Sequence, residues 1–160
     1  MRTAFLPALI CLIAAMQGSP AAAQGSPAQR ELYPPTEQAA ADIAAAIKSA
    51  QIAHRRVILD FGGNWCTDCH VLDAYFHDPA NKPILDANFI LVHVNIGRLD
   101  ANLDIAERYQ IPLKKGVPAI AVLSDRGALL YSQKTGEFEA MRYMQPGAVT
   151  EFLEHWKRRS

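Results

Sequence analysis

The sequence predicts an α/β domain in which a central β-sheet is flanked by helices. Residues 57–61 form a near-continuous apolar run, which is typical of a central strand covered on both faces. Two further apolar runs, at residues 89–96 and 119–123, alternate with segments whose apolar residues have helical spacing. The last such segment has apolar side chains at i, i+3, i+4 and i+7, namely Val149, Phe152, Leu153 and Trp156, so we expect Trp156 in the core.

The chain begins with a segment that we expect to direct export. Arg2 supplies a positive charge, residues 4–16 are apolar, and the alanines at 21–23 suit a cleavage site. The apolar stretch is too short to span a bilayer, so residues 1–23 are predicted to be a signal peptide, removed together with Cys11. The mature protein is then expected in the periplasm, with no stable insertion in the membrane.

The remainder of the chain is the size of one domain and carries almost no net charge. Loss of Arg2 from the 16 basic residues leaves 15 against 16 acidic residues, a net charge close to −1. Because no basic stripe is present, nucleic acid is not an expected partner. Residues 24–35 are polar and contain proline and glycine, which predicts a flexible lead-in to a domain over residues 36–160.

Apolar periodicity predicts two helices before and between the strands. The first begins at Thr36, whose hydroxyl can cap it, and runs to about residue 55 with an apolar face of Ile43, Ile47 and Ala50. The second covers residues 99–109, with an apolar face of Leu99, Leu103 and Ala106. The other predictions, in chain order, are a loop and short helix at 77–88, a turn at 124–127, a hairpin strand at 128–132 and a helix from about 148; residues 133–143 are left unassigned.

A Cys-x-x-Cys motif follows the first predicted strand, where a helix should begin. At that spacing Cys66 and Cys69 can close a small reversible disulfide, and the partial positive charge of a helix N-terminus favours thiolate over thiol. Cys66, at the more exposed end, is the expected nucleophile, and Cys69 its resolving partner. With Cys11 removed, these two cysteines are the only ones left, so the exported chain uses cysteine for chemistry and not as a disulfide framework.

Three other interpretations apply to the same motif: a zinc site, a c-type haem attachment site and a copper site. A zinc site usually needs a second cysteine pair or a Cys/His set, and here no further cysteine follows while the histidines are scattered. Cys66 to His70 also spells the c-type haem attachment string, with His70 as the proximal ligand, although haem attachment needs no strand directly before it. A copper-handling module would use both cysteines and a histidine.

Three short motifs together resemble the thioredoxin superfamily. They are Asp60-Phe61, then Trp65-Cys66-x-x-Cys69 after a strand, and Gly116-Val117-Pro118 ahead of another apolar strand. The similarity extends from Val57 to the C-terminus. It implies a thioredoxin-like fold with a central mixed β-sheet, and an exported thiol–disulfide oxidoreductase that requires no cofactor and no metal.

The resemblance also implies roles for individual residues. Asp60 matches the acid that lies under the disulfide and assists proton transfer to the resolving thiol, and burial would raise its pKa; the alternative is a strand-end carboxylate in solvent. Trp65 matches the flat aromatic that shields the sulfurs. Pro118 matches the cis-proline that faces them, so that the backbone of Val117 can pair with an extended substrate. His93 falls where thioredoxin keeps a lysine, and it is either a proton-handling partner of Asp60 or a half-buried strand residue with no role.

Thr67 and Asp68, between the cysteines, depart from the Gly-Pro of thioredoxin. A carboxylate there should raise the pKa of the Cys66 thiol and make the disulfide less oxidising, which favours reduction of protein disulfides over their formation. A cationic His70 would act the other way. Reduction in an oxidising periplasm needs an electron supply, for which a membrane reductase is the expected donor. Residues 112–115 are an insertion at the rim of the site, and the substrate is not identified by the sequence.

Overall fold

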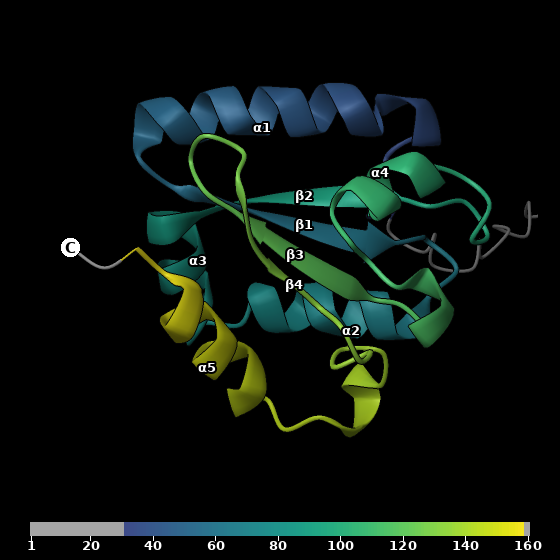
Figure 1. The fold of residues 1–160 in the computed structure, drawn as a ribbon. Helices are drawn as coiled ribbons and strands as arrows, with labels where there is room; N and C mark the ends of the chain where they lie inside the picture. The colour runs from purple at the N-terminus through teal and green to yellow at the C-terminus, as the bar shows by residue number, and fades with distance from the viewer. Residues whose placement is uncertain (1–30, 159–160) are drawn as a thin grey trace, which may run out of the picture.

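A four-stranded mixed β-sheet forms the centre of the protein. The computed structural model describes residues 31–158, and its sheet has the strand order β2-β1-β3-β4 (Figure 1). The strands are β1 (Arg56–Gly62), β2 (Phe89–Asn95), β3 (Ala119–Leu123) and β4 (Leu129–Ser132). β1 and β2 are parallel, whereas β3 is antiparallel to both β1 and β4. The predicted mixed sheet is therefore confirmed, including the hairpin between β3 and β4.

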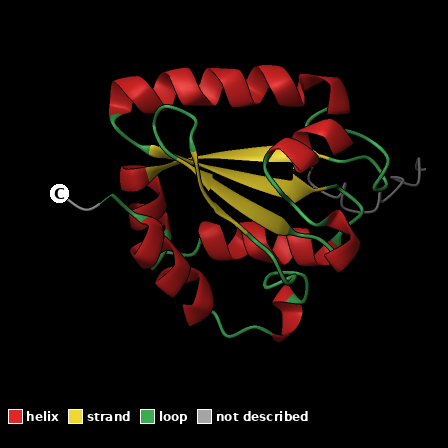
Figure 2. Ribbon diagram, in the orientation of Figure 1, coloured by secondary structure: helices red, strands yellow, loops and turns green. Residues whose placement is uncertain are grey.

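Five α-helices cover the two faces of this sheet. They are α1 (Ala39–Ala53), α2 (Thr67–Phe76), α3 (Lys82–Asn88), α4 (Leu103–Arg108) and α5 (Gly147–Trp156), with short 3-10 turns η1 (Thr36–Gln38), η2 (Leu113–Lys115) and η3 (Met141–Tyr143). α1 and α4 lie on one face, and α2, α3 and α5 lie on the other (Figures 1 and 2). Among the described residues no helix is long and apolar enough to cross a bilayer.

The alternation of side chains along β1 decides what lies behind the cysteines. Val57, Leu59 and Phe61 pack in the cluster under α1 and α4, whereas Ile58 packs with Leu72 and Phe76 of α2. Since successive side chains of a strand point to opposite faces, Asp60 lies on the α2 face with Ile58. Its neighbour in the parallel register of β2 is His93, so the two side chains stand next to each other on that face.

The N-terminal boundary of the domain differs from the sequence prediction. Within residues 24–35, expected to be a flexible lead-in, Leu32 and Tyr33 are held against the domain by hydrogen bonds to Asn64, and Tyr33 is only 2 % exposed. Thr36 does not cap α1, because it lies in η1 and its hydroxyl contacts Glu37. Residues 24–30 and the predicted signal peptide at 1–23, with Cys11, lie outside the described residues.

The helix predicted over residues 99–109 is shorter than expected. α4 begins at Leu103, because Gly97, Leu99 and Asn102 have positive φ angles of 58°, 71° and 54°, which a right-handed helix does not permit. Leu99 and Leu103, predicted to face the core, are 45 % and 49 % exposed. Ala106, predicted for the same face, is buried as expected, and Ile105 is buried beside it. By contrast, the apolar face predicted for α5 is confirmed: Val149, Phe152 and Leu153 are buried, and Trp156 packs partly buried against that cluster.

Candidate active site

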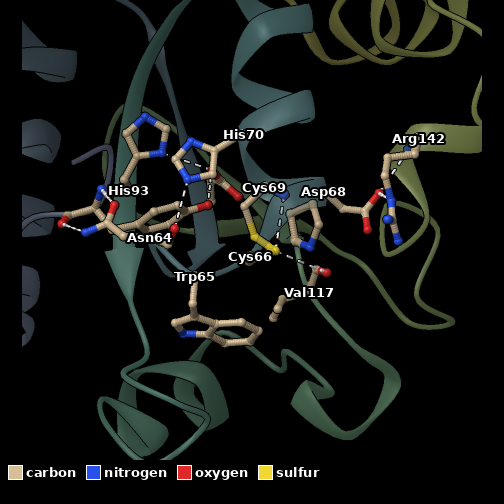
Figure 3. The surroundings of a disulfide bond; sticks show 12 residues. Asn64, Trp65, Cys66, Asp68, Cys69, His70, His93, Val117 and Arg142 are labelled. Carbon is tan, nitrogen blue, oxygen red and sulfur yellow. Dashed lines mark hydrogen bonds and ion pairs between the residues drawn. A yellow bond between two sulfur atoms is a disulfide. The ribbon is translucent and has the colours of Figure 1, made fainter. Parts of the chain in front are cut away.

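A disulfide joins Cys66 and Cys69 at the N-terminus of α2 (Figure 3). Cys66 is the N-cap residue, with an extended backbone, and its Sγ accepts a hydrogen bond of 3.1 Å from the backbone N–H of Cys69. The Cys69 N–H and the helix dipole both stabilise negative charge on that sulfur. Cys66 is 5 % exposed and Cys69 is fully buried, so an incoming partner would meet Cys66 first.

Trp65 and the backbone of Val117 flank the disulfide on two sides (Figure 3). The indole N–H of Trp65 donates to the carbonyl of Gly97 at 2.6 Å, which fixes the ring while 39 % of the residue remains exposed. The Val117 carbonyl oxygen lies 3.7 Å from Cys66 Sγ, and the peptide bond between Val117 and Pro118 is cis. The structure thus brings Trp65, Val117 and the two cysteines together, with Pro118 next in the chain.

Asp60 lies fully buried behind the disulfide, on the neighbouring strand β1. One carboxylate oxygen, Oδ2, accepts two hydrogen bonds: from the hydroxyl of Tyr33 at 2.7 Å and from Nδ1 of His93 at 2.9 Å. The other oxygen, Oδ1, is buried with no hydrogen-bond partner among the described residues. A buried carboxylate oxygen without a donor is a position where a proton can be taken up.

His93 bridges two carboxylates. Its Nε2 lies 3.6 Å from Oδ1 of Asp73, on α2, while its Nδ1 faces Asp60. Burial alone lowers the pKa of His93, but hydrogen bonds to Asp60 and Asp73 and the charges of both acids outweigh it and raise that pKa from 6.5 to about 9. Hence His93 is cationic at neutral pH, and the pair that the sequence suggested with Asp60 has a third member, Asp73, in the same buried cluster.

Tyr33 is a site residue that the sequence analysis missed. The Asn64 side chain, in the turn before Trp65, accepts hydrogen bonds of 2.8 Å from the N–H groups of Leu32 and Tyr33 and donates one of 2.9 Å to the Tyr33 carbonyl. These hydrogen bonds hold Tyr33 in a buried cluster that also contains Cys66 and Cys69. Burial, and then the negative charge of Asp60, keep the pKa of Tyr33 well above its ordinary value. The only sequence signal was an aromatic residue in a polar segment.

Asp68 does not stand alone beside Cys66, as the sequence analysis assumed. It is 9 % exposed, and its Oδ1 accepts hydrogen bonds from the backbone N–H of Arg142 at 2.9 Å and from the guanidinium Nε of Arg142 at 3.1 Å (Figure 3). The cation offsets the carboxylate charge that was expected to destabilise the Cys66 thiolate. Arg142 lies within residues 133–143, for which the sequence predicts no element; in that segment Phe138 and Met141 are buried against α2 and α5.

The geometry does not suit a haem or copper site on these residues. A thioether to haem would require Cys69, which is fully buried, to reach a bulky group. The His70 ring, the predicted ligand, is turned toward the turn before α2, where its Nε2 lies 2.9 Å from the Asn64 carbonyl. No group of three or more metal-ligating side chains gathers within residues 31–158.

Comparisons with known proteins agree with this geometry. A family model described as thioredoxin-like matches residues 38–124, more than half of the chain. The thiol:disulfide interchange protein DsbD of Pseudomonas fluorescens is 30 % identical over 118 residues, which are 69 % of this chain and 19 % of that protein. The chain thus spans about a fifth of the length of the curated relative it matches.

Solved structures agree as well. The disulphide isomerase of Xylella fastidiosa Temecula1 matches with a TM-score of 0.74 and 29 % identity, over 80 % of this chain and 98 % of that one. A thioredoxin from Thermus thermophilus matches with a TM-score of 0.51 and 19 % identity, over 70 % of this chain and 81 % of that one, which shows a common fold.

Proposed function

This chain belongs to the thioredoxin-like family of thiol–disulfide oxidoreductases, and we propose that it reduces disulfides of other proteins in the periplasm. The observation that carries the proposal is the disulfide between Cys66 and Cys69 with a buried acid, Asp60, behind it. The signal peptide predicted at residues 1–23 supports an exported location.

The reaction proceeds through a mixed disulfide. The Cys66 thiolate attacks one sulfur of a substrate disulfide, and the other substrate sulfur leaves as a thiolate that takes up a proton. Cys69 then loses its proton and attacks the Cys66 sulfur. The bond between Cys66 and the substrate breaks, the second substrate thiol is released, and two electrons have passed to the substrate as Cys66 and Cys69 become a disulfide.

Asp60 is the proposed acceptor of the Cys69 proton. Cys69 is fully buried, so water cannot serve freely as its base, and Asp60 on β1 is a fully buried carboxylate. His93 holds a positive charge against Asp60 and keeps the carboxylate available as a base. The proton then leaves through His93, whose side chain is 16 % exposed.

The reductive direction rests on the charges behind the disulfide. Asp60 and Asp73 are two buried carboxylates; His93 lies between them, and His77 contacts Asp73 as well. The negative charge of the Asp60 carboxylate opposes a thiolate on either cysteine, which makes the disulfide a weaker oxidant. Arg142 pairs with Asp68 and offsets the charge that was expected to destabilise the Cys66 thiolate. The preference for disulfide reduction is therefore assigned to the buried acids and not to Asp68.

Substrate recognition is assigned to the rim of the site. An extended substrate segment would pair with the backbone at Val117, beside Pro118, and would pack its cysteine against Trp65. The electrons for each cycle would come from a membrane reductase, since the periplasm is kept oxidising. The relative DsbD is named a thiol:disulfide interchange protein, which supports exchange with a second dithiol protein as the source of these electrons.

A trapping experiment tests this function. Reduced protein carrying Cys69→Ser is mixed with insulin, whose chains are joined by disulfides, and should accumulate a mixed disulfide through Cys66, because the resolving thiol is absent. The wild type should reduce insulin with turnover when dithiothreitol is supplied, and Cys66→Ser should do neither. Absence of both the trapped complex and turnover would refute the proposal.

Disulfide isomerisation is a second candidate, because the Xylella fastidiosa structure carries that name and matches over 98 % of its length. Isomerisation requires the attack by Cys66 and the later release of the same sulfur, but it does not require Cys69. Refolding of scrambled ribonuclease therefore separates the two: isomerase activity survives Cys69→Ser, whereas net reduction of insulin does not.

A further inference from the structure

The Tyr33 hydroxyl occupies a position between the resolving cysteine and the buried acid. It donates a hydrogen bond of 2.7 Å to Oδ2 of Asp60. Tyr33 also packs in one buried cluster with Cys66 and Cys69. Nothing in the reaction as described above uses this hydroxyl, although Tyr33 is buried and its hydroxyl is hydrogen-bonded to the proposed base.

Gly62 shows how closely the hydroxyl and the sulfur approach. A Cβ on Gly62 would lie 2.5 Å from the Tyr33 hydroxyl oxygen and 2.6 Å from Cys69 Sγ. The two atoms therefore converge on one point beside the end of β1. Only a residue without a side chain leaves this space open, since real Cβ atoms do not approach other atoms so closely.

The position of Tyr33 is fixed by hydrogen bonds from several parts of the fold. The side-chain oxygen of Asn64 accepts from the N–H groups of Leu32 and Tyr33, and its side-chain nitrogen donates to the Tyr33 carbonyl. Asn95 donates to the Pro34 carbonyl at 2.7 Å. Asn102 donates to the Thr36 carbonyl at 2.8 Å. Residues 32–36 thus form a strap across the end of the sheet, anchored by three asparagines. A catalytic side chain requires such anchoring, because misplacement by about 1 Å can cost a hundredfold in rate.

We propose that the Tyr33 hydroxyl is a catalytic group of this reaction, relaying the proton of Cys69 to Asp60. As Cys69 attacks the Cys66 sulfur, its proton passes to the Tyr33 oxygen while the hydroxyl proton of Tyr33 passes to Asp60. Tyr33 gains one proton and loses one, so it stays neutral; Cys69 becomes the attacking thiolate and Asp60 becomes a carboxylic acid. This step deepens the proposed function and rests on it.

The surroundings of Tyr33 favour a relay over a tyrosinate. Three titratable side chains face it: Asp60 from β1, His93 from β2 at a ring distance of 5.1 Å, and Asp73 from α2, whose charge also acts on it. Burial and the two acids keep the pKa of Tyr33 well above its ordinary value, so the hydroxyl keeps its proton unless it receives another.

Stopped-flow reaction with Ellman's reagent separates the two steps. The reduced protein releases one thionitrobenzoate when Cys66 attacks and a second when Cys69 resolves the mixed disulfide. For Tyr33→Phe we expect an unchanged first phase and a second phase at least about tenfold slower at neutral pH, since general acid–base groups contribute about 10²–10⁴ in rate. The control is Tyr109→Phe, which removes a hydroxyl from a buried tyrosine in the cluster under α1.

The pH dependence distinguishes catalysis from packing. Between about pH 6 and 8 the wild-type second phase should change little, whereas in Tyr33→Phe it should rise about tenfold per pH unit, because solvent must then deprotonate Cys69. Gly62→Ala, which places a methyl group where the hydroxyl and sulfur converge, should move the second phase in the same direction. A slower second phase with the wild-type pH profile would show a purely structural role and overturn the relay.

A measurement on the wild-type protein tests the relay without relying on a variant that could misfold. In mixtures of light and heavy water, a relay that moves two protons together gives a curved dependence of the second-phase rate on deuterium content. A linear dependence, or a Tyr33→Phe second phase equal to that of the wild type, would overturn the proposal. Loss of the first phase in every protein, wild type included, would instead refute the proposed function.

Discussion

Replacement of His93 by glutamine should remove a pH-dependent part of the folding free energy. The pKa of His93 rises from 6.5 to about 9 in the folded protein, because Asp60 and Asp73 outweigh the effect of burial. This rise corresponds to about 3 kcal/mol, at 1.36 kcal/mol for each pH unit. The His93 side chain is only 16 % exposed, so solvent screening of this contribution is small.

Because the pKa of His93 is raised in the folded state, its contribution to folding stability decreases as the pH rises. Protonation of His93 stabilises the folded state fully below about pH 6.5, and this stabilisation is lost as the pH rises through about 9. Urea unfolding of the oxidised protein, in which the cysteines do not titrate, measures it. The free energy of unfolding falls by about 1–3 kcal/mol per molar urea. The loss of the His93 contribution should therefore lower the wild-type urea midpoint by on the order of 1–3 M over that pH range.

His93→Gln should lack this fall, and His155→Gln, which alters a histidine on the exposed side of α5, should keep it. The comparison between variants cancels the other groups that titrate at high pH. If His93→Gln loses as much stability as the wild type between about pH 6.5 and 9.5, then His93 is not held as a cation by the two acids.

Three further predictions concern the other features of the site and the core. Arg142→Ala leaves Asp68 uncompensated beside Cys66, so the disulfide should become more reducing by about 10–30 mV in equilibrium with glutathione, while Asp68→Asn should shift the potential the other way. Met141→Ala opens a cavity at a fully buried position and should cost about 2–5 kcal/mol of unfolding free energy, against less than about 1.5 kcal/mol for Met141→Leu; equal effects of the two variants in urea unfolding would contradict this. Gly127→Ala should destabilise the turn between β3 and β4 by about 1 kcal/mol or more, because its φ of +81° disfavours a side chain and a Cβ would lie 2.9 Å from Ile47; an unchanged melting temperature would disprove it.

The strand, turn and helix around the cysteines could be predicted because their signals are local. The apolar run of β1, the Cys-x-x-Cys spacing and the periodicity of α5 each lie within a few residues of one another in the sequence. The partnership of Asp60 with His93 was also accessible, since both lie in predicted strands. The structure adds the register: β1 and β2 pair in parallel, and this pairing places Asp60 beside His93.

The parts of the site that could not be predicted depend on distant contacts. Tyr33 is placed by Asn64, 31 residues further along the chain, and Asp68 is neutralised by Arg142, 74 residues away. Neither contact leaves a pattern in the sequence around its members. The start of α4 was misjudged for a different reason: the left-handed backbone at Leu99 and Asn102 overrides an apolar spacing that favours helix.

The redox equilibrium of the Cys66–Cys69 pair with glutathione tests the central claim most directly. The sequence contains two tryptophans, so in a Trp156→Phe background the fluorescence of Trp65, beside the disulfide, reports the state of the pair alone. We predict a reversible two-electron disulfide with a potential closer to about −270 mV, that of thioredoxin, than to about −120 mV, that of a strong oxidase. A potential near about −120 mV would reverse the proposed direction, and failure of the two thiols to form a reversible disulfide would contradict the oxidoreductase account itself.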